Sequence, residues 1–134
     1  MMDEFSLTLV KKERPLRQDV DAKLEWLLRV LGSGRFAAEY ARILKDVVAC
    51  MRRGERLYIT AYAHSRGYKR TALSYHVHKL VTMGVLKRSG RGYTLRASNL
   101  ERTVEEIKRD VDRLFEDILR VARELDELLG LPRG

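Results

Sequence analysis

The sequence predicts a mainly α-helical protein with one small β-hairpin, an α+β fold that ends in a long helix. Three observations support this prediction. Apolar residues recur at helical spacing through most of the chain. Two short alternating segments flank Ser89-Gly90-Arg91-Gly92, which is typical of a hairpin. From residue 100 onward, apolar residues follow an unbroken heptad, which is typical of a coiled coil.

The first 32 residues are expected to form an arm and one helix. An alternating segment around Leu7 predicts a strand or arm within residues 1–17. Asp19 can cap a helix that stops at Gly32. Because the apolar face of this helix is too wide for an isolated helix, we expect residues 18–32 to pack against the last helix in a dimer core.

Residues 33–97 are expected to form the central domain. A helix over about residues 35–52 is predicted from an apolar face spaced 4, 3, 4, 3: Phe36, Tyr40, Ile43, Val47 and Cys50. Residues 56–59 are predicted to form a short strand. Thr60 can cap the next helix, over residues 61–66. Gly67 then allows a sharp turn into a further helix.

The helix over residues 70–83 has two different faces. Leu73, Val77 and Leu80 form the expected buried side. The opposite side and its margins carry polar and basic residues: Lys69, Arg70, Thr71, Ser74, Tyr75, His78 and Lys79. A helix of this kind fits the major groove of B-form DNA, and its N-terminal half reaches the base edges. We therefore expect these residues to bind DNA.

The hairpin that follows carries three cations near its tip. Lys87 and Arg88 are expected to take phosphates, and Arg91 to enter the minor groove. The charge distribution supports this interpretation. Residues 52–97 hold 11 basic groups and one acid, a net charge of +10, whereas the segments before and after carry +1 and −3. Such a concentrated positive charge is typical of a polyanion-binding surface.

The stretch from Ala63 to Leu80, with Met83-Gly84-Val85-Leu86, resembles the winged helix-turn-helix of ArsR/MarR-like prokaryotic transcription regulators. The resemblance is close over a third of the chain and loose over residues 35–96. It implies a DNA-binding domain in which Gly67 makes the turn and Gly84 ends the recognition helix. Two residues depart from the pattern: Arg66 replaces an apolar residue, and Lys69 replaces the usual Ser or Thr cap. Arg66 could extend toward a phosphate, or its helix could be shifted.

The last helix is predicted to start at Asn99 and to run to about residue 129 within a segment that covers residues 98–134. Its seam is spaced 4, 3 throughout: Leu100, Val104, Ile107, Val111, Leu114, Ile118, Val121, Leu125 and Leu128. A rod of about 45 Å cannot bury this stripe within a small domain, so we expect a homodimer. The resemblance also implies a dimerisation helix, as in small archaeal members of the group. The direction of pairing stays open.

Other kinds of site have little support in the sequence. His64, His76, His78 and Cys50 lack the paired cysteines of metal-sensing relatives, so we expect no metal. Cys50 continues an apolar stripe and is expected to be buried. No phosphate-binding glycine loop or nucleophile motif is present, so we expect neither an enzyme nor a cofactor.

The composition bounds the setting of the chain. A lone cysteine and the absence of an apolar run of about 20 residues favour a cytoplasmic protein outside the membrane. Few amides and many charged residues are typical of thermophile proteins.

The sequence therefore predicts a homodimeric, sequence-specific regulator that binds double-stranded DNA. A non-specific architectural DNA-binding protein and a winged-helix protein–protein adaptor are the alternatives. The operator, any small-molecule effector, and the choice between repression and activation are not determined by the sequence.

Overall fold

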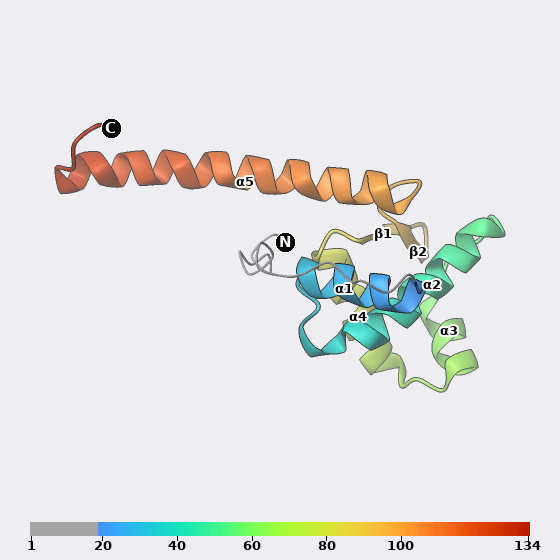
Figure 1. Ribbon diagram of the computed structural model, residues 1–134. Coiled ribbons are helices and arrows are strands. Elements are labelled where there is room, and N and C mark those ends of the chain that lie inside the picture. Colours follow the sequence, from blue (N-terminus) through green and yellow to red (C-terminus); the bar gives the residue numbers. More distant parts are fainter. Residues whose placement is uncertain (1–18) are drawn as a thin grey trace.

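The computed structural model describes residues 19–134 as a helical head from which one long helix projects (Figure 1). Within this range the elements, in order, are α1 (Val20–Leu31), the 3-10 turn η3 (Gly34–Phe36), α2 (Ala37–Arg52), α3 (Ile59–Arg66), α4 (Arg70–Thr82), β1 (Leu86–Ser89), β2 (Gly92–Leu95) and α5 (Leu100–Leu129). The fold is therefore mainly helical with a small antiparallel sheet. The arm predicted for residues 1–17 lies outside the described residues.

Helix α1 begins and ends as the sequence predicts and packs on α2. The Asp19 carboxylate accepts a hydrogen bond from the backbone N–H of Ala22, and Gly32 adopts a left-handed conformation with φ of 111°. Leu24, Leu28 and other buried residues of α1 join one hydrophobic core with α2. The core-facing side of α1 is thus used within the chain, and its contact with a partner's helix stays a prediction.

Helix α3 begins earlier than the sequence predicts. Thr60 was expected to cap it, but the helix starts at Ile59, and its N-cap is Tyr58, which makes no side-chain capping hydrogen bond. The predicted turn at Gly67 is confirmed, with φ of 72°. Because this left-handed conformation strains other residues, glycine fits the position. Figure 1 shows the turn between α3 and α4 on the side of the head away from α5.

The hairpin predicted around Ser89-Gly90-Arg91-Gly92 is confirmed as the antiparallel pair β1 and β2. Leu86 pairs with Leu95, and Ser89 pairs with Gly92, so that Gly90 and Arg91 alone form the turn. The strand predicted over residues 56–59 is wrong, because only a single bridge forms there, between Leu57 and Tyr93. The early start of α3 leaves too few residues for a longer strand.

Helix α5 is anchored to the head at its beginning. Asn99 caps it by accepting a hydrogen bond from the backbone N–H of Arg102 at 2.8 Å. Ile107 is only 2% exposed and belongs to the core of the head. Arg96, just after β2, forms ion pairs with Glu106 at 3.1 Å and with Asp110 at 2.7 Å. The first three turns of α5 are thereby fixed to the exit of the hairpin.

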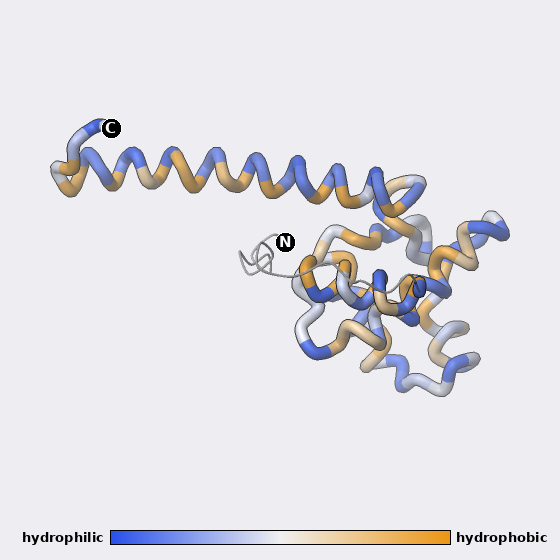
Figure 2. Tube along the Cα trace, viewed as in Figure 1, coloured by the Kyte–Doolittle hydropathy of each residue, from blue (hydrophilic) through white to orange (hydrophobic). Residues whose placement is uncertain are grey.

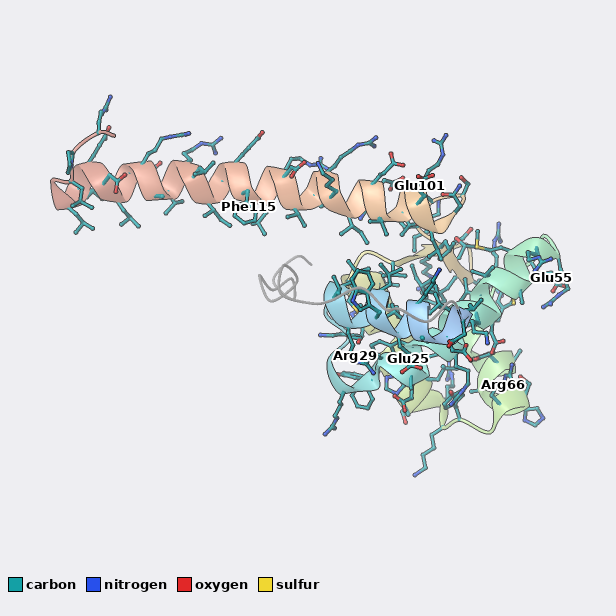
Figure 3. The ribbon with its side chains drawn as sticks, in the orientation of Figure 1. Glu25, Arg29, Glu55, Arg66, Glu101 and Phe115 are labelled. Carbon is teal, nitrogen blue, oxygen red and sulfur yellow. The ribbon has the colours of Figure 1, made fainter. Side chains whose placement is uncertain are left out.

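Beyond the head, α5 continues as a free rod. Its apolar residues line the side of α5 on which the head lies, and its charged residues line the opposite side (Figure 2). Phe115 lies on the first side and Glu101 on the second (Figure 3). Helix α5 is long, but it carries many charged residues. No helix among residues 19–134 is both long enough and apolar enough to cross a bilayer.

Candidate nucleic-acid interface

The turn between α3 and α4 is held against α2 by a polar cluster. The Tyr62 hydroxyl donates a hydrogen bond to the Asp46 carboxylate, and the Arg66 guanidinium pairs with the same carboxylate at 2.9 Å. On the other side of the turn, Arg42 donates to the Tyr68 hydroxyl at 3.0 Å. The Tyr62 and Tyr68 rings stack with centroids 6.0 Å apart. Together these contacts fix the position at which α4 begins.

The same cluster shows what Arg66 does in the structure. Its carboxylate partner raises the pKa of the Arg66 guanidinium, and burial together with the hydrogen bond to Asp46 raises the pKa of Tyr62. Arg66 is exposed on α3 (Figure 3), but its charge is used to hold α3 to α2. Its predicted extension toward a phosphate would require this ion pair to break.

Helix α4 has the two faces that its sequence predicts. Leu73, Val77 and Leu80 are fully buried. Arg70, Thr71, Tyr75 and His78 are exposed, and Ser74 and Lys79 are half-buried. Among these side chains Tyr75 is the largest apolar group in solvent, at 59% exposed. The outer face therefore offers hydrogen-bonding groups, cations and aromatic rings.

The first turn of α4 lacks a capping side chain. Lys69 occupies the N-cap position, makes no side-chain capping hydrogen bond, and is exposed. No acid lies in this first turn. The first backbone N–H groups of a helix have no partner within the helix, and the helix dipole favours an anion beside them. The exposed Lys69 at the N-cap thus makes the start of α4 attractive to an anion.

His76 faces inward from α4, unlike Tyr75 and His78. Its ring contacts Phe36 at a centroid distance of 4.9 Å and Tyr40 at 5.1 Å, both from the adjoining segment of the head. Burial lowers the pKa of His76, and the charge of Glu39 opposes this effect. Its Nδ1 atom is buried without a hydrogen-bond partner. His76 therefore supports the packing of α4 as a neutral ring, whereas His78 remains in solvent.

The hairpin presents its cations at the turn and along β1. Gly90 is the first of the two turn residues and has φ of 60°, which is typical of a type II′ turn. Arg91, the second, is exposed. Lys87 and Arg88 are also exposed, and as consecutive strand residues they point to opposite faces of the hairpin. The three predicted cations thus surround the hairpin and do not share one face.

Arg56 is a further cation at this surface that the sequence did not single out. A Cβ atom at Gly90 would lie 2.9 Å from Arg56 Nη1, and one at Gly92 would lie 2.8 Å from Arg56 Cβ. The bridge from Leu57 to Tyr93 brings the segment alongside the hairpin. The sequence pattern around Arg56, with the apolar Leu57 between Arg56 and Tyr58, indicated a strand. It did not indicate that this segment would lie beside the hairpin.

Apart from Lys79, the cations of residues 52–97 fall into two groups in the structure. Arg53, Arg66 and Arg96 pair with acids of the chain. Others have no carboxylate partner within the described part of the chain: Arg52, Arg56, Lys69, Arg70, Lys87, Arg88 and Arg91. The second group lies on the α4 start, the hairpin, and the segment beside it. The net positive charge of residues 52–97 is therefore uncompensated at the start of α4 and around the hairpin.

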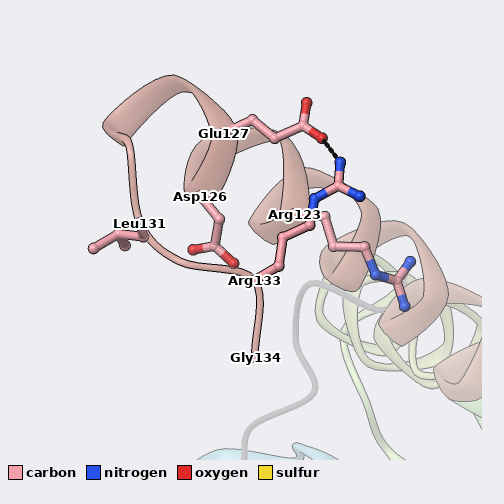
Figure 4. A pocket seen from close by; sticks show the side chains of 6 residues that line it. All are labelled: Arg123, Asp126, Glu127, Leu131, Arg133 and Gly134. Carbon is pink, nitrogen blue, oxygen red and sulfur yellow. Dashed lines mark hydrogen bonds and ion pairs between the residues drawn. The ribbon is translucent and has the colours of Figure 1, made fainter.

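Other features of the described residues give weaker support for a functional site. A hollow at the end of α5 is lined by Arg123, Asp126, Glu127, Leu131, Arg133 and Gly134 (Figure 4). Arg133 pairs there with Glu127, so this charge is compensated within the hollow. Cys50 is half-buried, against an expectation of full burial, and accepts a hydrogen bond from Arg53. Across residues 19–134, no three His, Cys, Asp or Glu side chains converge as a metal site would require.

The chain was compared with known proteins by sequence and by structure. No protein-family model, curated protein or solved structure matches it.

Proposed function

We propose that this protein is a sequence-specific double-stranded DNA-binding transcription regulator that acts as a homodimer. The observation that carries the proposal is the group of uncompensated cations on the α4 start and the hairpin. Arg66 and Arg96 are paired with acids, whereas Lys69, Arg70, Lys87, Arg88 and Arg91 have no carboxylate partner among residues 19–134. Cations without a carboxylate partner create a positive potential that attracts a polyanion.

In this proposal α3, the turn at Gly67 and α4 form a helix-turn-helix, with α4 as the recognition helix. Its outer face enters the major groove, where Arg70 pairs with a guanine edge or a phosphate. Thr71 and Ser74 are short and allow close approach, and Tyr75 contacts a thymine methyl group or a phosphate. The cluster around Asp46 supports this role because it holds the start of α4 rigidly.

The hairpin acts as the wing of the domain. Arg91 at its turn reaches the minor groove, and Lys87 and Arg88 contact the backbone. Since Lys87 and Arg88 point to opposite faces, we expect one of them to contribute more than the other. Arg56, beside Gly90, adds a further phosphate contact. The small turn of Gly90 and Arg91 keeps the tip slim enough for a groove.

Two such heads are joined by the projecting part of α5. A homodimer presents two recognition helices, and these contact half-sites one helical turn of DNA apart, or about 34 Å. The preferred site is then palindromic or nearly so. The exposed apolar stripe beyond the head supports this assembly.

The proposal is tested by selecting bound sites from random duplexes and measuring affinity by fluorescence anisotropy over a series of salt concentrations. We expect at least about 10³-fold preference for the selected site over bulk DNA. Arg70→Ala should weaken binding, and Arg91→Ala should also flatten the salt dependence because fewer counterions are released. Arg109→Ala removes an equal charge from the exposed side of α5 and serves as the matched control.

Each outcome bears on the proposal. Equal affinity for all duplexes would point to an architectural protein and contradict sequence-specific regulation. Absence of binding at moderate salt would contradict DNA binding altogether and leave the adaptor alternative. If Arg109→Ala weakens binding as much as Arg70→Ala does, the interface lies elsewhere on the chain.

A further inference from the structure

The far part of α5 presents a long apolar surface to solvent. Eight large apolar residues of this part and the adjoining tail are at least 40% exposed: Phe115, Ile118, Leu119, Val121, Leu125, Leu128, Leu129 and Leu131. Leu128 reaches 82%. Figure 2 shows that this apolar side continues along one edge of the rod. Monomeric proteins seldom leave so large a contiguous apolar surface in water, so we expect a partner to cover it.

The spacing of the surface identifies the partner as a helix with the same repeat. Apolar residues at alternating intervals of 3 and 4 pack as knobs into the holes of a second helix. Helix α1 has already buried its inner face on α2. Among the described helices, α5 is the one with a long exposed heptad, and a second copy of the chain supplies it.

The head limits which part of the seam a partner can reach. Ile107 is buried in the core, and Leu100 and Val111 pack against that core. A pairing along the whole helix is therefore blocked by the head. The available seam runs from about Val111, whose side chain is only partly buried by the head, to Leu128.

The residues beside the seam distinguish the two directions of pairing. One flank is apolar in this region and consists of Phe115, Ala122 and Leu129. The other flank is acidic and consists of Asp110, Asp117 and Glu124. Parallel helices place the apolar flank of one copy against the acidic flank of the other, whereas antiparallel helices place each flank against itself. Antiparallel pairing therefore buries the apolar flanks together.

Antiparallel pairing also brings the acidic flanks together, and the structure reduces this cost. Arg113 pairs with Asp110 at 2.7 Å, and Arg120 pairs with Asp117 at 3.2 Å. Both ion pairs lie within one helix, so each arginine still compensates its acid when two helices pair. The remaining repulsion involves Glu124 most directly.

We propose that two copies of this chain pair antiparallel through residues 111–128 of α5, with Leu114 of one copy opposite Leu125 of the other. Ile118 then lies opposite Val121, and Val111 lies opposite Leu128. This register uses all six available seam positions and stops where Ile107 is buried in the head. The inference gives the geometry of the proposed homodimer and rests on it, and it places the two heads at opposite ends of the rod.

Spin labels on the outer side of α5 measure the direction of pairing. In a Cys50→Ser background of the full chain, Arg102→Cys and Arg123→Cys are labelled separately, and distances are measured by pulsed dipolar spectroscopy without DNA. At 1.5 Å per residue, the antiparallel register places the labels at position 102 about 50 Å apart and those at position 123 about 20 Å apart. A parallel pair gives similar short distances at both positions.

Equal distances at the two positions would overturn the antiparallel proposal while leaving a homodimer. Absence of dipolar coupling at both positions would show a monomer and overturn the interface as well. DNA binding is measured separately by anisotropy on the same labelled protein, so failure of the dimer geometry is distinguished from failure of DNA binding.

A charge reversal tests the register independently. In the antiparallel dimer, Glu124→Lys places a lysine of each copy opposite Asp117 of the other copy, so two attractive pairs form. We expect the dimer dissociation constant to fall roughly five- to tenfold in analytical ultracentrifugation. Glu116→Lys makes the same charge change on the outer side of α5 and should leave that constant nearly unchanged. Equal effects of the two substitutions would overturn the proposed register.

Discussion

The two halves of α5 share one sequence pattern and have different surroundings. In the first half, Ile107 is buried and Arg96 ties the helix to the hairpin. In the second half, Ile118 is 47% exposed and Leu125 is 48% exposed, although both continue the same seam. The comparison teaches that a heptad indicates which face of a helix is covered. It does not indicate whether the cover comes from the same chain or from another.

The largest expected effect separates the halves by stability. Ile107→Ala removes a buried side chain from the core and should lower the free energy of unfolding by about 2–5 kcal/mol. Leu125→Ala, at an exposed seam position, should change it by less than about 0.5 kcal/mol in dilute protein where chains are monomeric. Urea unfolding followed by circular dichroism measures both. Equal losses would show that the second half also packs on its own head.

The next effect separates the halves by association. Leu114→Asp combined with Ile118→Asp places two charges in the proposed seam and should raise the dimer dissociation constant by at least about 100-fold. Sedimentation equilibrium provides the measurement. Arg109→Gln with Arg123→Gln changes the net charge equally on the outer side and should leave the dimer intact. A dimer that survives the two aspartates would remove this seam from the interface.

Ion pairs provide a finer comparison of the halves. Arg96 and Asp110 are 25% and 23% exposed, whereas Arg120 and Asp117 are 67% and 68% exposed. A double-mutant cycle with Arg96→Met and Asp110→Asn should give a coupling energy of about 1 kcal/mol, and one with Arg120→Met and Asp117→Asn about 0.3 kcal/mol. Because Asp110 also pairs with Arg113, the cycle is needed to isolate the Arg96 term. Equal couplings would mean that Arg96 does not hold the helix to the head.

The smallest expected effect concerns the same contrast between inner and outer sides on α4. Burial lowers the pKa of His76 in the folded protein, so the unfolded chain binds the proton more readily. The stability from the neutral ring is therefore complete above the unfolded pKa, near 6.5, and is lost as pH falls toward the lower folded value. Urea midpoints between pH 8 and pH 5 should show this loss.

The control for this prediction uses the two histidines of α4. His76→Gln should reduce the fall in stability at low pH, whereas His78→Gln, at an exposed position, should retain the wild-type profile. A profile unaffected by His76→Gln would assign the pH dependence to other groups.

Local signals predicted much of the fold. Asp19 and Asn99 cap the helices that they were expected to cap, because an N-cap depends on a side chain and a backbone N–H three residues away. Gly67 and Gly90 mark turns for a similar local reason, since each adopts a positive φ. Thr60 is the exception: residues with a capping side chain are favoured at helix starts, but they are not required there.

Contacts between distant residues could not be predicted in the same way. The pairing of Arg66 with Asp46 joins residues on different helices, and the charge tally counted Arg66 among the available cations. Arg56 was included in the charge count, but its position could not be predicted. It lies beside Gly90 of the hairpin because Leu57 forms a bridge with Tyr93. The residues of the candidate interface on α4 could be predicted since one helical face determines them. Their electrostatic surroundings required the packed head.

The junction around Gly84 has a mechanical consequence. Gly84 has φ of 85°, and a Cβ atom there would lie 3.0 Å from Arg96 Nη1 and 3.2 Å from Ile107 Cγ1. A side chain at Gly84 would press on Arg96 and Ile107, so the end of α4 and the first turns of α5 are closely packed at this point. Since the rod is about 45 Å long, a tilt of about 5° at this point moves its far end by about 4 Å. The effect of a single added methyl group at position 84 would therefore be amplified along α5 into a displacement of its far end.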